Sequence, residues 1–175
     1  MIPEAVRRAV EARLGLVRGA SPVPGGCINH GIRVELADGP VFVKYNPEAP
    51  PGLFAAEARG LKALRRAADG IVVPRALAWA DAEEGAPAWL ALEWLEPGRR
   101  APDFAERVGR GLAGIHGLTQ GDEWRWGWME DNFIGPLPQA NARTASWAEF
   151  WRTRRLEPQI ALARSQGRLP GKAAE

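Results

Sequence analysis

Residues 31–45 most constrain the fold, because apolar side chains recur there at every second position. Ile32, Val34 and Leu36 alternate with charged residues, which is typical of a strand with one buried face. The turn sequence ADGP separates this run from a second run, VFVKY. Together the two runs predict an antiparallel hairpin over residues 31–45.

Changes of period elsewhere in the chain predict the remaining elements. Residues 53–68 carry apolar side chains at steps of three and four, as an amphipathic helix does. The segment 21–31 is dense in proline and glycine, which predicts a loop. We also expect a first helix, two strands after the long helix and two later helices, at residues 3–14, 71–80, 88–98, 103–118 and 146–167.

The order of these elements predicts an α+β fold of two lobes. Residues 1–97 would form a small antiparallel sheet with one packed helix, and residues 98–175 the first helices of an incomplete helical lobe. The boundary is placed at Pro97 and Gly98, which end the last predicted strand.

Composition argues against several classes of partner. The chain has 23 Lys and Arg against 21 Asp and Glu, a net charge of +2, and the basic residues are scattered, so we expect no nucleic-acid partner. No segment approaches the roughly 20 apolar residues that cross a membrane, so we expect a cytoplasmic protein without a membrane partner. The single cysteine, Cys27, fits a reducing compartment and predicts no cysteine-based metal site.

Lys44 lies near the end of the second run of the hairpin, and the following helix offers a partner for its charge. Glu57 lies on the same stripe of that helix as Phe54 and Leu61. An unpaired buried carboxylate costs several kcal/mol, so we expect Lys44 to be its partner. A strand lysine paired with a helix glutamate holds the ATP phosphates in protein kinases, although a purely structural ion pair has the same pattern.

Two other segments of the sequence are compatible with a nucleotide site, and equally with an ordinary loop and an ordinary strand. The loop GGCINHG differs from a Walker A loop, because Ile32-Arg33 replaces Lys-Ser/Thr and a strand follows it. A glycine-rich turn before a strand lysine suits phosphate binding by backbone N–H groups. The segment LALEWLEPG would lead into a hinge, with Leu92 as gatekeeper and Glu93 and Leu95 offering a carbonyl and an N–H to adenine.

Six segments in this order resemble the fructosamine kinase (ketosamine-3-kinase) family: GGCINHG, GPVFVKYN, LFAAEARGLKAL, LALEWLEPG, DNFIGPLPQANA and SWAEFWRTRRLEPQIALA. The resemblance covers nearly the whole chain, and its last two segments are the most specific. It implies the fold shared by protein kinases and aminoglycoside phosphotransferases. It also implies ATP-dependent phosphorylation of free or protein-bound ketosamines, which reverses glycation.

The resemblance assigns roles to individual residues. Lys44 would contact the ATP phosphates and Glu57 would hold Lys44. The loop would cover the phosphates and the hinge would bind adenine, through Gly25, Gly26, Cys27, Ile28, Asn29, His30, Gly31, Glu93, Trp94 and Leu95. Further family matches have no role assigned by sequence: His116, Asp131, Asn132 and Gln139. The alternating tryptophans at 124, 126 and 128 fit either a sugar-binding face or packing.

One departure from the family pattern concerns catalysis. The catalytic loop His-Gly-Asp-Leu-Trp-x-x-Asn and the later magnesium-holding aspartate do not occur in these 175 residues. Phosphoryl transfer needs a positioned base and a metal ion. We therefore expect the Mg²⁺ ligands downstream of this chain, and we expect the chain alone to have no kinase activity. The alternatives are a non-catalytic nucleotide-binding or interaction module, or a fragment of an aminoglycoside- or choline-type kinase.

Cys27 lies within the proposed phosphate loop. The resemblance implies that oxidation could link two chains into a homodimer through this cysteine, as in some family members, and disturb ATP binding. An inert small residue is the alternative interpretation.

Overall fold

The computed structural model describes residues 2–26, 28–67, 70–117 and 126–169. It contains two compact units, Met1–Leu118 and Thr119–Glu175. Among the described helices, none is long and apolar enough to cross a membrane. The lobe boundary at residues 97 and 98 stays a prediction.

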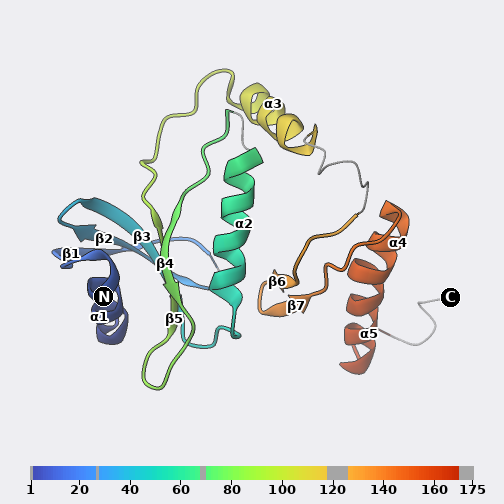
Figure 1. Cartoon of the computed structure of the whole chain (residues 1–175), viewed down its shortest axis with the longest axis horizontal. Helices are drawn as coiled ribbons and strands as arrows, with labels where there is room; N and C mark the ends of the chain where they lie inside the picture. The colour runs from blue at the N-terminus through green and yellow to red at the C-terminus, as the bar shows by residue number, and fades with distance from the viewer. Residues whose placement is uncertain (1, 27, 68–69, 118–125, 170–175) are drawn as a thin grey trace. The chain divides into compact units, whose positions relative to one another are not determined.

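The first unit is built on a five-stranded antiparallel sheet (Figure 1). In spatial order its strands are β1 (Gly19–Val23), β2 (His30–Leu36), β3 (Gly39–Asn46), β5 (Ala88–Glu93) and β4 (Ala76–Ala80). The predicted hairpin is confirmed as β2 and β3, with Ile32 opposite Val43. The same register places Lys44 opposite Gly31. Residues that lie opposite each other in an antiparallel pair are on the same face of the sheet, so these two positions share a face.

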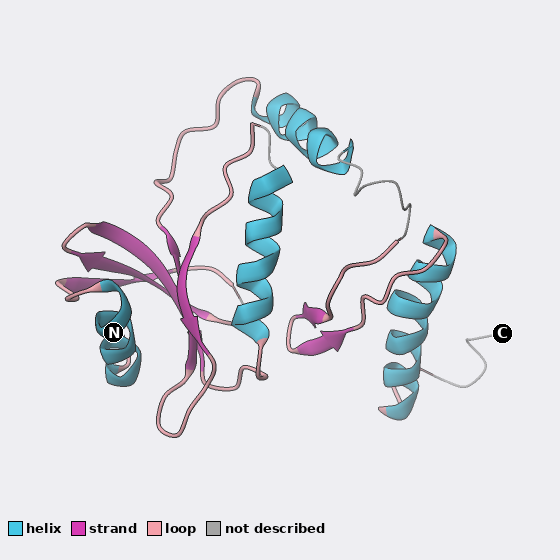
Figure 2. Ribbon diagram, in the orientation of Figure 1, coloured by secondary structure: helices cyan, strands magenta, loops and turns pink. Residues whose placement is uncertain are grey.

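Helices cover both faces of this sheet, as Figures 1 and 2 show. Helix α1 (Glu4–Leu14) packs Val6 and Val10 into a core with β2, β3 and β5. Helix α2 (Leu53–Ala67) packs Phe54 on the other face, against Leu90. The sequence predicts one packed helix, and α1 is the additional cover. Strand β5 is buried on both sides, which explains its nearly continuous apolar sequence, AWLALE.

Strand β1 differs from the sequence prediction, which assigns residues 21–31 to a loop. Ser21, Pro22 and Val23 pair with β2. Proline is depleted in strands because it lacks an N–H donor, but it is tolerated in an edge strand such as β1. The loop between β1 and β2 is therefore shorter than predicted. Helix α3 (Phe104–Gly117) completes the described elements of the first unit.

The second unit combines a hairpin with a long helical segment. The hairpin consists of β6 (Asn132–Ile134) and β7 (Leu137–Gln139), which are not among the elements expected from the sequence. The helical segment is α4 (Trp147–Trp151), the π-helix η1 (Arg152–Leu156) and α5 (Glu157–Ser165). Ser146 caps it by accepting the N–H of Glu149 at 3.2 Å, and the sequence Ser-x-x-Glu is typical of such caps. Pro158 lies directly after the π-helix inside this helical segment, so the hydrogen-bond pattern changes next to a residue that has no N–H donor.

Candidate nucleotide site

The predicted ion pair joins the sheet to helix α2. The Nζ atom of Lys44 lies 2.5 Å from Oε1 of Glu57, and the two side chains are 18% and 31% exposed. Lys44 reaches α2 because it alternates with Val43, which faces α1. Its ammonium also lies 5.9 Å from the centre of the Phe54 ring, within cation–π range. The pair is half-buried, so water screens it less than it screens a surface pair.

Lys44 and most of the predicted loop residues line one open cavity of about 430 Å³. Sequence reasoning predicts six of its lining residues: Gly25, Gly26, Ile28, Asn29, Gly31 and Lys44. Val23, Pro24 and Phe42 also line it, and their type gave no signal of a site. The cavity therefore brings a cation and a glycine-rich backbone together from segments that are separate in the sequence.

Glycine is required at this cavity for two different physical reasons. Gly25 and Gly26 have φ angles of +113° and +80°, which strain any residue with a side chain. Gly31 has ordinary backbone angles, but a Cβ atom there would lie 3.1 Å from the ring of Phe42 and 3.3 Å from the carbonyl oxygen of Val23. The first two shape the loop, and the third keeps space above the strand that carries Lys44.

His30 and the predicted hinge do not line this cavity. The imidazole of His30 stacks on Tyr45 with ring centres 4.9 Å apart. Tyr45 packs with the core under α1, so this ring lies on the face opposite Lys44. Cys27 lies outside the described residues.

Glu93, at the end of β5, is tied to the segment before β4. Its N–H donates to the carbonyl oxygen of Arg75 at 2.8 Å, and its carboxylate accepts the N–H of Arg75 at 3.2 Å. Arg65, near the end of α2, lies 3.7 Å from the same carboxylate and donates to the carbonyl oxygen of Val73 at 2.6 Å. The Arg33 guanidinium stacks on the next residue, Trp94, at 5.0 Å. The side chain of Glu93 thus fixes the strand ends beside the predicted hinge.

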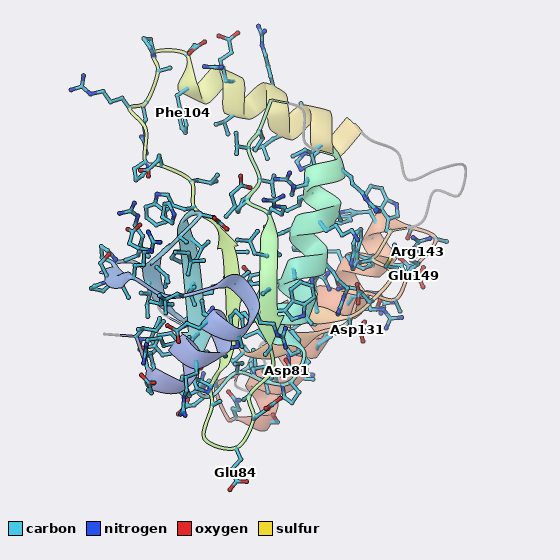
Figure 3. The ribbon with its side chains drawn as sticks, turned by 60° about the vertical axis from the view of Figure 1, so that its left-hand side comes forward. Asp81, Glu84, Phe104, Asp131, Arg143 and Glu149 are labelled. Carbon is cyan, nitrogen blue, oxygen red and sulfur yellow. The ribbon has the colours of Figure 1, made fainter. Side chains whose placement is uncertain are left out.

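In the second unit, Asp131, Asn132 and Gln139 form hydrogen bonds that stabilise the hairpin, although the sequence assigned them no role. Asn141 is 2% exposed; its N–H donates to Asp131 at 2.8 Å, and its side-chain amide donates to Asn132 at 2.8 Å. Gln139 donates to the same oxygen of Asn132 at 2.9 Å. Arg155, from η1, donates to the Oδ1 atom of Asn141 at 2.6 Å, and burial lowers the pKa of its guanidinium. These bonds tie the hairpin to the helical segment, and Figure 3 labels Asp131 among them.

The remaining candidate residues from the sequence are His116 and the alternating tryptophans. His116 is exposed on α3 within the first unit. Trp126 packs edge-on against Trp147 with ring centres 5.2 Å apart, and the two residues are still 44% and 49% exposed. Trp124 lies outside the described residues. Among the described residues there is no cluster of three His, Cys, Asp or Glu side chains that could hold a metal ion.

The two-faced antiparallel sheet and the lysine–glutamate pair define a kinase-like class of fold. The family model for fructosamine kinase matches residues 4–175, so the chain belongs to the fructosamine kinase family. A crystal structure of a candidate fructosamine-3-kinase from Thermobifida fusca superposes with a TM-score of 0.79 at 34% identity, covering 97% of this chain and 57% of that one. The predicted fold class and family are thereby confirmed.

Two curated relatives carry names that specify an activity. A probable ketoamine kinase of Synechocystis is 41% identical over 152 residues, 86% of this chain and 50% of that protein. A chloroplastic protein-ribulosamine 3-kinase of Oryza sativa is 34% identical over 152 residues, 87% of this chain and 43% of that protein. The chain thus spans about half the length of the curated relatives that it matches.

Proposed function

We propose that the native protein is an ATP-dependent kinase that phosphorylates the sugar moiety of free or protein-bound ketosamines. The observation that carries this proposal is the Lys44–Glu57 pair, 2.5 Å apart, beside a cavity walled by a glycine-rich loop. The names of relatives in the same family, ketoamine kinase and ribulosamine 3-kinase, support the substrate class.

The residues at the cavity fit the triphosphate of ATP, which supplies the phosphoryl group when bound. Lys44 offers an ammonium, a strong donor to anionic oxygens, and Glu57 holds its side chain in place. Gly25 and Gly26 leave the loop backbone free of side chains, so its N–H groups can approach phosphate oxygens. Backbone groups of residues 93–95 would hold adenine.

Magnesium and the catalytic base are expected outside the described residues. The family's catalytic loop does not occur in these 175 residues, and the described part offers no metal-binding cluster. The part that we assign to this chain is therefore to bind and orient the nucleotide.

The test uses the purified native protein, ATP, Mg²⁺ and a peptide that carries a ribulosamine or a fructosamine on lysine. We expect transfer of phosphate to the sugar moiety, detected by mass spectrometry, and its loss in Lys44→Met. Lys62→Met is the matched control, because Lys62 is exposed on α2. Turnover that persists in Lys44→Met, or that occurs only with aminoglycosides or choline, would contradict the proposal.

A non-catalytic nucleotide-binding module is the second candidate, and it would use the same Lys44–Glu57 pair and glycine-rich loop. ATP binding by the native protein without any transfer to ketosamine would support it.

The Cys27-linked homodimer and the cytoplasmic location stay predictions from the sequence. Non-reducing gel electrophoresis after mild peroxide tests the dimer. A dimer band that forms equally well in Cys27→Ser would exclude a link through this residue.

A further inference from the structure

Asn46, the last residue of β3, forms hydrogen bonds through both the nitrogen and the oxygen of its side-chain amide, beside the proposed phosphate site. It is 8% exposed. Its Nδ2 atom donates to the carbonyl oxygen of Ile28 at 3.3 Å and to Oδ1 of Asn29 at 3.1 Å. Its Oδ1 atom accepts the N–H of Glu48 at 2.8 Å. Both kinds of hydrogen-bonding group in the amide, the N–H donors and the carbonyl acceptor, are therefore satisfied.

Both partners of the Nδ2 atom belong to the glycine-rich loop and line the cavity. Strand β1 ends at Val23 and β2 begins at His30, so the described loop residues 24–26, 28 and 29 lie outside both strands. A Cβ atom at Gly25 would meet nothing within 4 Å, so the backbone faces open space on that side. Glycine-rich backbone loses much conformational freedom when it is ordered, and an anchor lowers that cost before a ligand binds.

The same strand carries the anchor and the cation. Asn46 follows Lys44 by two positions, so both side chains leave β3 on the same face. One strand therefore sets the place of the Lys44 ammonium and of the loop end that contains Ile28 and Asn29. Glu48 completes the arrangement by holding the Asn46 amide in one orientation.

We propose that Asn46 is a positioning residue that fixes the glycine-rich loop over the site where Lys44 meets the phosphates of ATP. The inference rests on the proposed function for the identity of the ligand. Asn46 acts through the loop and touches no phosphate, so its effect is confined to ligands that the loop contacts.

Three variants of the full chain separate this role from a general contribution to folding. Asn46→Asp keeps the shape and the acceptor for Glu48, but it sets an oxygen against two acceptor oxygens in the loop. Asn29→Ala removes one of these acceptors from the loop side and leaves Asn46 in place. Ser146→Ala is the control, because it breaks a hydrogen bond of similar length, 3.2 Å to the N–H of Glu149, in the second unit.

Calorimetric titration with ATP and with adenosine, which lacks phosphates, measures the effect. We expect the dissociation constant for ATP to rise about tenfold in Asn46→Asp, which loses two hydrogen bonds and adds a negative charge near the phosphates. In the neutral variant Asn29→Ala, which changes only the loop contact, we expect a rise of about threefold. The constant for adenosine should stay unchanged in both variants. Hydrogen exchange of the Ile28 and Gly26 amides should be faster in Asn46→Asp than in Ser146→Ala, without any nucleotide.

The outcomes distinguish this inference from the proposed function. Wild-type affinity for ATP in Asn46→Asp, or equal weakening of ATP and adenosine, would overturn the positioning role. If the wild-type chain binds no ATP, the proposed function fails. Faster loop exchange in Asn46→Asp would then still support the anchor, and unchanged exchange would overturn it.

Discussion

Lys44 is fixed by its surroundings at the scale of single residues. Glu57 neutralises its charge, and the Phe54 ring lies beside its ammonium. An ammonium on a four-carbon stem carries much rotational freedom, so this support matters more for a lysine than for a stiffer side chain. These contacts hold the Lys44 ammonium in place at the cavity that we propose for the phosphates.

Glu57→Gln should weaken ATP binding with little loss of stability. The amide keeps the volume of the side chain but no longer attracts Lys44, so we expect the dissociation constant for ATP to rise about tenfold. The free energy of unfolding should fall by only about 1 kcal/mol, because the pair is partly solvated. Calorimetry and denaturant titration measure the two effects. Glu84→Gln is the control, since Glu84 lies at the exposed tip of the loop before β5 (Figure 3). Equal ATP affinity in both variants would contradict the role of Glu57.

Gly31→Ala and Gly60→Ala should change stability in opposite directions. The new methyl group at position 31 presses on the Phe42 ring at 3.1 Å, so we expect a loss of about 1–2 kcal/mol. Gly60 is inside α2 with open space where a Cβ atom would lie, so alanine should add about 0.5–1 kcal/mol. Thermal unfolding of the two variants checks this. A Gly31→Ala variant that is more stable than wild type would contradict this prediction, because the Phe42 ring would then move aside without cost.

At the scale of elements, α2 is held near both of its ends. Before its first turn, the N–H of Gly52 donates to Asp81, which Figure 3 labels after β4. Near its last turn, Arg65 binds Val73 and Glu93. Glu57 lies between these attachments, so the helix that holds Lys44 is tied to β4 and β5 independently of any ligand.

Asn141→Ala should loosen the hairpin of β6 and β7. It removes a buried acceptor from Arg155 and a donor from Asn132, and we expect a loss of about 2–3 kcal/mol in stability. Hydrogen exchange of Ile134 should become faster. Arg164→Ala, on the exposed side of α5, is the control. Unchanged exchange in Asn141→Ala would mean that the hairpin does not depend on this network.

Periodicity in the sequence predicted the elements that bury a continuous face. The β2–β3 hairpin and α2 repeat apolar residues over many positions, so burial dictated their form. Strand β1 carries Pro22 and little apolar surface, and its strand form comes from pairing with β2. The hairpin of β6 and β7 has strands of three residues, too short for a period to show.

The residues of the candidate site also differ in whether the sequence predicts them. Lys44 and Glu57 were predictable because each is a charge on an apolar stripe, and charges there need partners. Asn46 was missed because an asparagine at a strand end is an ordinary turn residue. Its partners in the loop depend on tertiary contacts that no local pattern encodes.

At the scale of the whole molecule, binding and turnover should separate. The 175 residues contain the proposed phosphate contacts but not the family's catalytic loop. We therefore expect the chain alone to release no ADP in the presence of ATP, Mg²⁺ and a ketosamine peptide, because positioning without base and metal does not complete phosphoryl transfer. A coupled assay measures ADP, with Lys44→Ala as background. Release above that background would show that catalytic groups exist elsewhere in the chain.

The most direct test of the central assignment is a calorimetric titration of ATP into the chain, into Lys44→Met and into Lys62→Met. If the cavity at Lys44 holds the phosphates, wild type and Lys62→Met should bind ATP equally. Lys44→Met should bind it at least about tenfold more weakly, because a charge-assisted contact is lost. Equal affinity for ATP in all three proteins would contradict the assignment, and the lysine–glutamate pair would then be structural.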